Sequence, residues 1–225
     1  MTTHYSEKKD LLPLTGGCAC GLIRYQLTQP PILVHCCYCT ACQRQTGSAF
    51  ALNAIIESTA LVQLPSASPS VAGNPAAPEP VCAGLMPAFA NATDSVSTTH
   101  EQPDPDSKPA PAPVCIPTQS GLGQTVAHCP SCHVGLWNFY ADGGPHVSYI
   151  RVGTLDRPWE IEPDVHIYTR SRMAFLAVND GKPQFEEYYP SRDALVQGDA
   201  LERLQALKPV VRNWWVDLKA ALSSQ

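Results

Sequence analysis

Apolar and polar residues alternate along much of this chain, and the alternation predicts short β-strands. In the segment 22–27 every second side chain is apolar, which is typical of a half-buried strand. The segment 49–56 is almost continuously apolar, so we expect it to be buried on both faces. Further strands are predicted at 32–35, 125–128, 134–140, 147–152 and 165–169, with a turn signal between 134–140 and 147–152 that predicts a hairpin.

The C-terminus has the different period of amphipathic helices. A capping-box pair, Asp199 and Glu202, predicts the start of one helix, which should end before Pro209. A second helix would place five apolar residues on one face: Val211, Trp214, Trp215, Leu218 and Leu222. We expect this face to pack on the protein's own domain. The sequence therefore predicts a mainly β fold of small antiparallel sheets with a C-terminal helical extension.

The central part of the chain interrupts this pattern with prolines. Of the 22 prolines, 12 lie between Pro65 and Pro117, a density that excludes helices and most central strands. We interpret about 64–114 as a disordered insertion within one domain, because the spacing of the cysteines on both sides of it suits one shared metal site. The predicted organisation is a polar leader at 1–14, an interrupted zinc-binding β domain at 15–190, and the helices at 191–225.

Charge and targeting signals narrow the class of partner. The net charge of −5 and the absence of any Lys/Arg run argue against a nucleic-acid partner. The N-terminus has no apolar core of the signal-peptide type, and no stretch reaches membrane-spanning length. We therefore expect a cytoplasmic protein with no membrane partner.

Ten cysteines are many for a reducing compartment, where metal binding is a better explanation than disulfides. Two closely spaced pairs stand far apart in the chain, Cys18 with Cys20 and Cys129 with Cys132. Four thiolates complete a tetrahedron and leave no open position, so these residues predict a structural zinc. The alternative is a redox disulfide between Cys129 and Cys132.

A second cluster supplies three further sulfurs from one short loop: Cys37, Cys39 and Cys42. Three protein ligands with one exchangeable position are typical of a catalytic zinc. The open position would hold water, or a substrate thiolate whose pKa the metal lowers. Cys36 is a competing fourth ligand that would close the site. We therefore expect two zinc ions per chain.

Two other residues have alternative interpretations. His166 lies on an alternating strand, where it would be an acid–base group, a substrate contact or a hydrogen-bonded structural histidine. Arg44 would pair with a carboxylate of an acidic substrate, or would be a solvated arginine beside a polar turn. Cys82 and Cys115 have no ligand-like spacing and are expected to be free thiols.

Taken in order, these motifs resemble the glutathione-dependent formaldehyde-activating enzyme family, a group of zinc proteins with the β-tent fold. The resemblance covers about 15–57 and 116–190. The segments that carry it are Gly16-Gly17-Cys18-Ala19-Cys20-Gly21, Cys37-Tyr38-Cys39-Thr40-Ala41-Cys42, Gly47-Ser48-Ala49-Phe50, Cys129-Pro130-Ser131-Cys132, Gly153-Thr154-Leu155-Asp156 and Glu162-Pro163-Asp164-Val165-His166-Ile167.

The resemblance implies a structural zinc on the first four cysteines and a catalytic zinc on Cys37, Cys39 and Cys42. It also implies glutathione as the thiol, with formaldehyde adding to it to give S-hydroxymethylglutathione, a carbon–sulfur lyase reaction on small-molecule substrates. Tyr38 stands where members often carry His or another polar residue, and Cys36 and the long insertion are additional features. The alternatives are a zinc-dependent lyase or isomerase of another metabolite, and a zinc-stapled binding module without catalysis.

Overall fold

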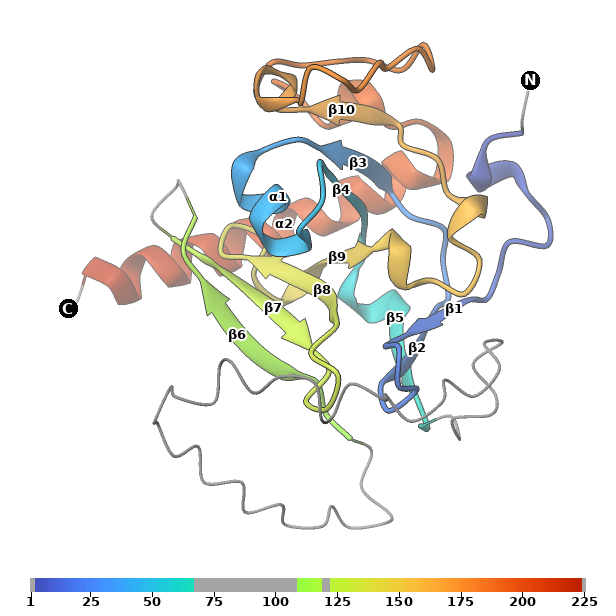
Figure 1. Ribbon diagram of the computed structural model, residues 1–225. Helices are drawn as coiled ribbons and strands as arrows, with labels where there is room; N and C mark the ends of the chain where they lie inside the picture. Colours follow the sequence, from blue (N-terminus) through green and yellow to red (C-terminus); the bar gives the residue numbers. More distant parts are fainter. Residues whose placement is uncertain (1–2, 67–108, 119–121, 224–225) are drawn as a thin grey trace, which may run out of the picture.

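The computed structural model describes residues 3–66, 109–118 and 122–223, and strands dominate it (Figure 1). The larger sheet has seven strands in the order β10-β3-β4-β9-β8-β7-β6, and the smaller has three in the order β1-β2-β5. All pairs are antiparallel except β10 with β3. The prediction of a mainly β fold with a C-terminal helical part is confirmed.

The strands are β1 (Leu14–Gly17), β2 (Arg24–Leu27), β3 (Leu33–Cys37), β4 (Ala51–Glu57), β5 (Leu61–Leu64), β6 (Ala112–Ile116), β7 (Gln124–His128), β8 (Gly135–Tyr140), β9 (Val147–Arg151) and β10 (Val165–Ile167). The helices are α1 (Thr40–Thr46) and α2 (Gly198–Ser223). Short 3-10 turns are η1 (Tyr5–Glu7), η2 (Ser58–Ala60), η5 (Gly144–His146), η6 (Val152–Thr154), η7 (Pro158–Glu160), η8 (Thr169–Ser171) and η9 (Asp193–Leu195).

Strand β4 lies between two hydrophobic cores, as its apolar sequence predicts. Ala54 and Ile56 belong to the core that also contains residues of β1 and β2. Ile55, which points to the other face, belongs to the core that contains Leu204 of α2. The prediction of burial on both faces is therefore correct, because successive side chains of one strand point to opposite faces of the sheet.

The predicted hairpin is also present, since β8 pairs antiparallel with β9, Asn138 facing Tyr149. Two strands border the segment that the sequence predicts to be an insertion: β5 ends at Leu64, and β6 begins at Ala112. Pro113 lies in β6, an edge strand of the sheet, where a missing N–H is tolerated. Residues 67–108, which include Cys82, lie outside the described residues.

The C-terminal segment forms one helix, so the prediction of two helices separated at Pro209 is wrong. α2 runs from Gly198 to Ser223 with Pro209 inside it. The proline removes one backbone hydrogen bond, but apolar side chains before and after it, Leu207 and Val211, pack against the same core. Packing of a continuous stripe on both sides of the proline stabilises the unbroken helix.

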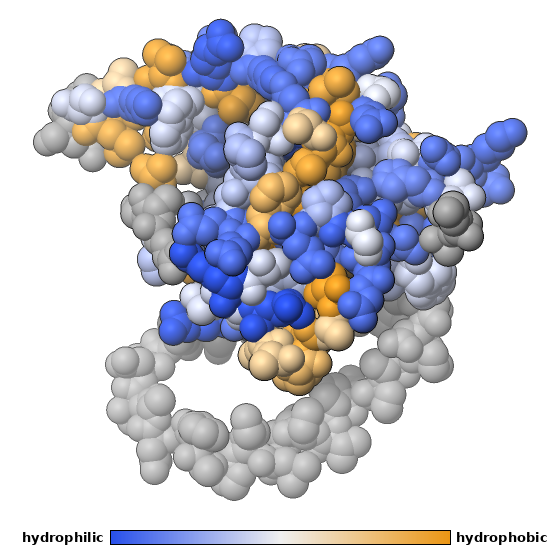
Figure 2. All heavy atoms as spheres, turned by 90° about the horizontal axis from the view of Figure 1, so that it is seen from above, coloured by the Kyte–Doolittle hydropathy of each residue, from blue (hydrophilic) through white to orange (hydrophobic). Residues whose placement is uncertain are grey.

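The end of α2 projects from the body of the protein (Figure 1), and hydrophobic residues are visible on this projection (Figure 2). Val216 and Leu222 are 59% and 51% exposed. At the other end of the chain the predicted polar leader packs on the domain through Tyr5 and Leu11, which are both buried. Within the described part of the chain, no helix is long and apolar enough to cross a membrane.

Candidate metal centres and the adjoining cavity

The structure brings together the sulfurs of Cys18, Cys20, Cys129 and Cys132, which we call the four-thiol group. These sulfurs lie within 4.8 Å of one another. The Sγ atom of Cys20 is 3.5 Å from that of Cys18 and 3.6 Å from that of Cys129. A regular tetrahedron of sulfurs around zinc has edges of about 3.8 Å. The four-thiol group can therefore hold a metal ion of this kind, and Cys129 and Cys132 are not joined by a disulfide.

Backbone amides point at these sulfurs, as expected for metal-binding turns that stabilise thiolates. The N–H of Ile23 donates to the Cys18 sulfur over 3.2 Å, and that of Cys132 to the Cys129 sulfur over 3.5 Å. Burial alone would raise the pKa of Cys132, but the backbone N–H groups of Val134 and Cys20, together with hydrogen bonds from the Cys129 and Cys20 thiols, lower it to about 7. The local backbone thus favours the charged sulfur that a metal needs.

A second set of sulfurs, from Cys37, Cys39 and Cys42, forms what we call the three-thiol group. Cys37 ends β3, Cys39 is the N-cap of α1, and Cys42 lies in its first turn. Their sulfurs also lie within 4.8 Å of one another. Hydrogen bonds from the Cys37 and Cys42 thiols and from backbone N–H groups lower the pKa of Cys39 to about 2. The group can hold a metal through three thiolates and leaves a fourth ligand position to another molecule.

Cys36 is not part of the three-thiol group. Side chains of β3 alternate between the two faces of the sheet, so Cys36 points away from the face that carries His35 and Cys37. Its thiol instead interacts with Tyr38, and burial raises its pKa to about 11. The fourth-ligand alternative for Cys36 therefore has no support in the geometry.

A buried arginine lies beside the three-thiol group. The Arg151 guanidinium donates to Asn53 Oδ1 over 2.5 Å and to Gln45 Oε1. No carboxylate lies within ion-pair distance of it in the described parts of the chain. The pKa of Cys42 is raised overall, although its hydrogen bond with Cys37 and the Arg151 charge both act to lower it. Three thiolates with a divalent cation carry one net negative charge, which Arg151 is placed to balance.

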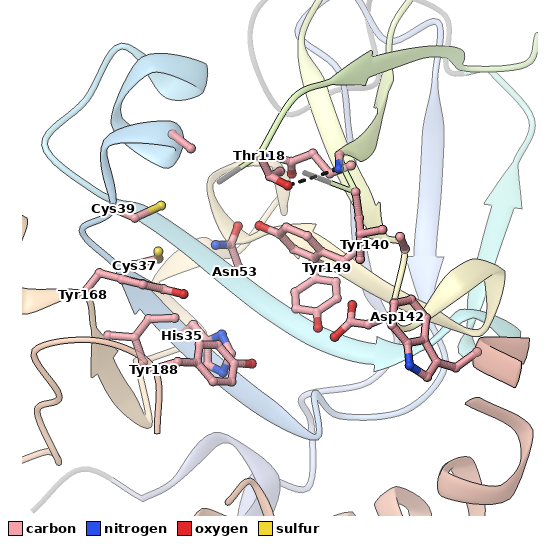
Figure 3. Close-up of a pocket in the computed structure, with 17 residues that line it drawn as sticks. His35, Cys37, Cys39, Asn53, Thr118, Tyr140, Asp142, Tyr149, Tyr168 and Tyr188 are labelled. Atoms are coloured by element: carbon pink, nitrogen blue, oxygen red, sulfur yellow. Dashed lines mark hydrogen bonds between the residues drawn. The ribbon is translucent and has the colours of Figure 1, made fainter. Parts of the chain in front are cut away.

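A cavity of about 390 Å³ opens beside the three-thiol group, with Cys37 and Cys39 in its wall (Figure 3). This volume falls in the range of about 300–1,000 Å³ that is usual for small-molecule sites. Five aromatic side chains line the wall, and it also contains His35, Asn53 and Asp142. The aromatic residues are Tyr140, Tyr149, Tyr168, Tyr188 and Trp215. No residue of the four-thiol group lines this cavity.

A histidine and two tyrosines in this wall have shifted pKa values, which determine their protonation at neutral pH. Burial, helped by the charge of Arg192, lowers the pKa of His35 to about 3, and its Nε2 lies 2.8 Å from the Tyr189 hydroxyl. His35 is therefore neutral. Burial and the charges of nearby cysteines raise the pKa of Tyr140 and of Tyr168. These two hydroxyls keep their protons and can donate hydrogen bonds into the cavity.

The other residues considered from the sequence lie outside this cavity. His166 is buried and bridges two side chains: its Nδ1 lies 3.0 Å from the Tyr38 hydroxyl and its Nε2 lies 2.7 Å from Asp180 Oδ2. These contacts favour the interpretation of His166 as a hydrogen-bonded structural histidine. Arg44 is exposed on α1 and does not line the cavity, so the solvated interpretation fits it better. Cys115 is an exposed free thiol in β6.

The sequence-based predictions missed Arg151, Arg192 and the tyrosines of the cavity. For Arg151 a signal was available, because it is a charged residue within the otherwise largely apolar predicted strand 147–152. For Arg192 and the tyrosines there was none, because they come from separate strands and loops that only the fold brings together.

Comparison with known proteins identifies a matching family model. A family model described as "Glutathione-dependent formaldehyde-activating enzyme" matches residues 13–77 and 107–171, more than half of the chain. No curated protein matches the chain. A crystal structure of a Rhodobacter sphaeroides protein aligns with 76% of this chain and 99% of its own, at 11% identity and a TM-score of 0.33.

Proposed function

The chain belongs to the family of glutathione-dependent formaldehyde-activating enzymes, and from this premise we propose that it joins a small thiol to an aldehyde and reverses that addition. In the forward direction the thiol sulfur bonds to the aldehyde carbon. The electron pair of the C=O bond moves to oxygen, which takes up the proton that the thiol has released. In reverse the carbon–sulfur bond breaks. Glutathione and formaldehyde are the substrates that the family suggests.

The observation that carries this proposal is the difference in surroundings between the two cysteine groups. Only Cys37 and Cys39, of the three-thiol group, lie in the wall of the cavity. We propose that the three-thiol group holds the catalytic zinc and the four-thiol group a structural zinc. Both donor sets fit, since each offers sulfurs close enough to share one ion. A zinc ion held by three thiolates would supply a positive charge that lowers the pKa of a thiol or polarises a carbonyl.

The chain's own residues would provide the remaining functions. The aromatic wall excludes water and holds the substrates near Cys37 and Cys39. Tyr140 and Tyr168, which keep their protons, would donate hydrogen bonds to the oxygen that becomes negative when the carbon–sulfur bond forms. His35 is neutral and hydrogen-bonded to Tyr189, so it serves to position the wall rather than to supply a proton.

The test is to change Cys39 to Ser and to measure zinc content and turnover together. We expect the wild-type protein to hold two zinc ions and to convert glutathione and ¹³C-formaldehyde to the hydroxymethyl adduct, followed by NMR exchange. Cys39→Ser should keep its circular dichroism spectrum, hold one zinc and lose at least about a hundredfold in rate, because metal-site disruption has effects of this size or larger. A wild-type protein with one zinc would contradict the proposal.

The matched control is Cys115→Ser, which changes an exposed free thiol that belongs to neither group. It should keep two zinc ions and the full rate. A rate in Cys39→Ser equal to that of this control would also contradict the proposal, even with one zinc lost, because the three-thiol group would then have no part in catalysis.

A further inference from the structure

A second cavity of about 360 Å³ adjoins the first, and the two share Asp142, Tyr149 and Trp215 in their walls. In Figure 3, Asp142 lies across the first cavity from Cys37 and Cys39. The second cavity therefore begins at the end of the first that is remote from the three-thiol group. Its wall differs in charge, because it contains three basic side chains: Arg192, Lys208 and Arg212.

Arg192 is the basic residue best placed to bind a ligand. Its Nε donates to the Tyr189 hydroxyl over 3.1 Å, and its Nη2 contacts the hydroxyls of Tyr188 and Tyr149 at 3.2 and 3.4 Å. All three partners are neutral. Among the described residues no carboxylate lies within ion-pair distance of Arg192. The hydrogen bonds of its guanidinium to described residues use Nε and Nη2, and not Nη1. A partly buried guanidinium usually has an anionic partner, so this one is available to a ligand.

The other charges of the cavity are arranged differently. Lys208 is already paired with Asp193. Asp142, by contrast, forms no ion pair with any described side chain, and its Oδ1 accepts a backbone N–H from Gly143. Arg192 and Asp142 therefore present opposite charges to the same cavity without neutralising each other. A ligand that carries a carboxylate and an ammonium group close together, as an α-amino acid does, would satisfy both.

The second cavity is built largely by residues outside the family match, which ends at 171. Helix α2 supplies most of its wall and is held firmly in place. Trp214 donates to the Ala141 carbonyl over 2.9 Å. Its indole lies against Gly144, where an added Cβ would come within 2.3 Å of Nε1 and the backbone φ is +54°. Arg203 forms an ion pair with Glu57 of β4. The cavity is therefore a fixed feature of this chain.

We propose that the second cavity binds the α-amino-acid head group of the thiol substrate, with Arg192 on its carboxylate and Asp142 on its ammonium group. This inference rests on the proposed function, because it takes the thiol end of the same molecule to lie beside Cys37 and Cys39. Arg192 and Asp142 then determine specificity: a thiol with such a head group binds across both cavities, and a thiol without one occupies only the first.

The experiment compares glutathione with two derivatives, one with only the head-group carboxylate converted to an amide and one with an acetylated amine. Binding to the zinc-loaded protein is measured by calorimetry, and KM by turnover. In the wild-type protein we expect the amide derivative to bind about 10–100-fold more weakly, which corresponds to the loss of one charge-assisted hydrogen bond pair. Arg192→Gln should bind glutathione as weakly as wild type binds the amide derivative, and Asp142→Asn should no longer distinguish the acetylated derivative.

Arg44→Gln is the matched control, since Arg44 is an exposed arginine that lines neither cavity, and it should keep the wild-type preferences. Equal affinity of the wild-type protein for glutathione and its amide derivative would overturn the proposal, as would an Arg192→Gln variant that still discriminates. If Arg192→Gln does not fold, the wild-type preferences and Asp142→Asn decide.

Turnover of 2-mercaptoethanol, which has no head group, separates this proposal from the proposed function. If the wild-type protein turns over no thiol at all, the proposed function fails, and the calorimetric preferences still decide whether the second cavity is a head-group site.

Discussion

The four-thiol group and the three-thiol group use the same ligand atom in different surroundings. The first joins turns separated by more than a hundred residues, Cys18–Cys20 and Cys129–Cys132, and does not line the cavity. The second comes from one stretch of six positions, contributes two residues to the cavity wall and has Arg151 beside it.

The difference shows that the kind of ligand does not determine what a metal site does. A site that joins distant segments stabilises the fold, because its ligands cannot meet in the unfolded chain. A local three-ligand site contributes less to long-range structure and leaves one position to a ligand. Three substitutions test whether one group is structural and the other catalytic, and they are given in order of decreasing expected effect on stability and zinc content.

The largest effect is expected on changing Cys129 to Ser. Removing one of four ligands should release the metal that joins both ends of the domain, with a loss on the order of 10 kcal/mol of folding free energy. The variant should therefore be unfolded at 37 °C and hold little zinc, as measured by circular dichroism and metal analysis. Ser131→Ala, which changes an exposed side chain between the two ligands, is the control. A Cys129→Ser protein that melts near the wild-type temperature would contradict a structural role.

An intermediate effect is expected on changing Arg151 to Met, which removes the positive charge beside the three-thiol group. Zinc affinity at that group and the turnover rate should each fall by about 10–100-fold. Stability should fall by about 1–3 kcal/mol, because Asn53 loses its hydrogen-bond donor. Release of zinc to a chelator should become faster for one ion of the two.

Arg151→Lys is the matched variant for this prediction, because it keeps the charge but not the two-sided hydrogen bonding. It should recover part of the zinc affinity. If both zinc ions were released faster to the same degree in Arg151→Met, the arginine would act on the whole fold and not on one metal group.

The smallest effect is expected on changing Cys36 to Ala. Its thiol points away from the three-thiol group and is protonated at neutral pH, since burial raises its pKa to about 11. We expect two zinc ions, a rate within about twofold of wild type, and a stability loss of about 1 kcal/mol from the smaller buried side chain. Loss of one zinc would show that Cys36 is a ligand and that the second metal site is closed.

The amino-acid sequence was sufficient to predict both cysteine groups and most of the strands. Close spacing of Cys37, Cys39 and Cys42 restricts their sulfurs to one small volume whatever the rest of the chain does. Alternation of apolar residues predicts strands such as β4 because it reflects burial directly. β1, β5, β6 and α1 were not predicted; β1 contains Gly16 and Gly17 and β6 contains Pro113, and these residue types are disfavoured in strands.

The tertiary structure alone decided the rest. The direction of the Cys36 side chain depends on the register of β3 in the sheet, and a shift by one residue would exchange its face with that of Cys37. The continuity of α2 across Pro209 depends on packing, which outweighs the local preference to end the helix there. Arg192 and Asp142 share a cavity wall only because the fold brings the start of η9 close to the turn after β8. Short-range spacing is thus a property of the sequence, whereas charges that meet across the fold depend on contacts between distant segments.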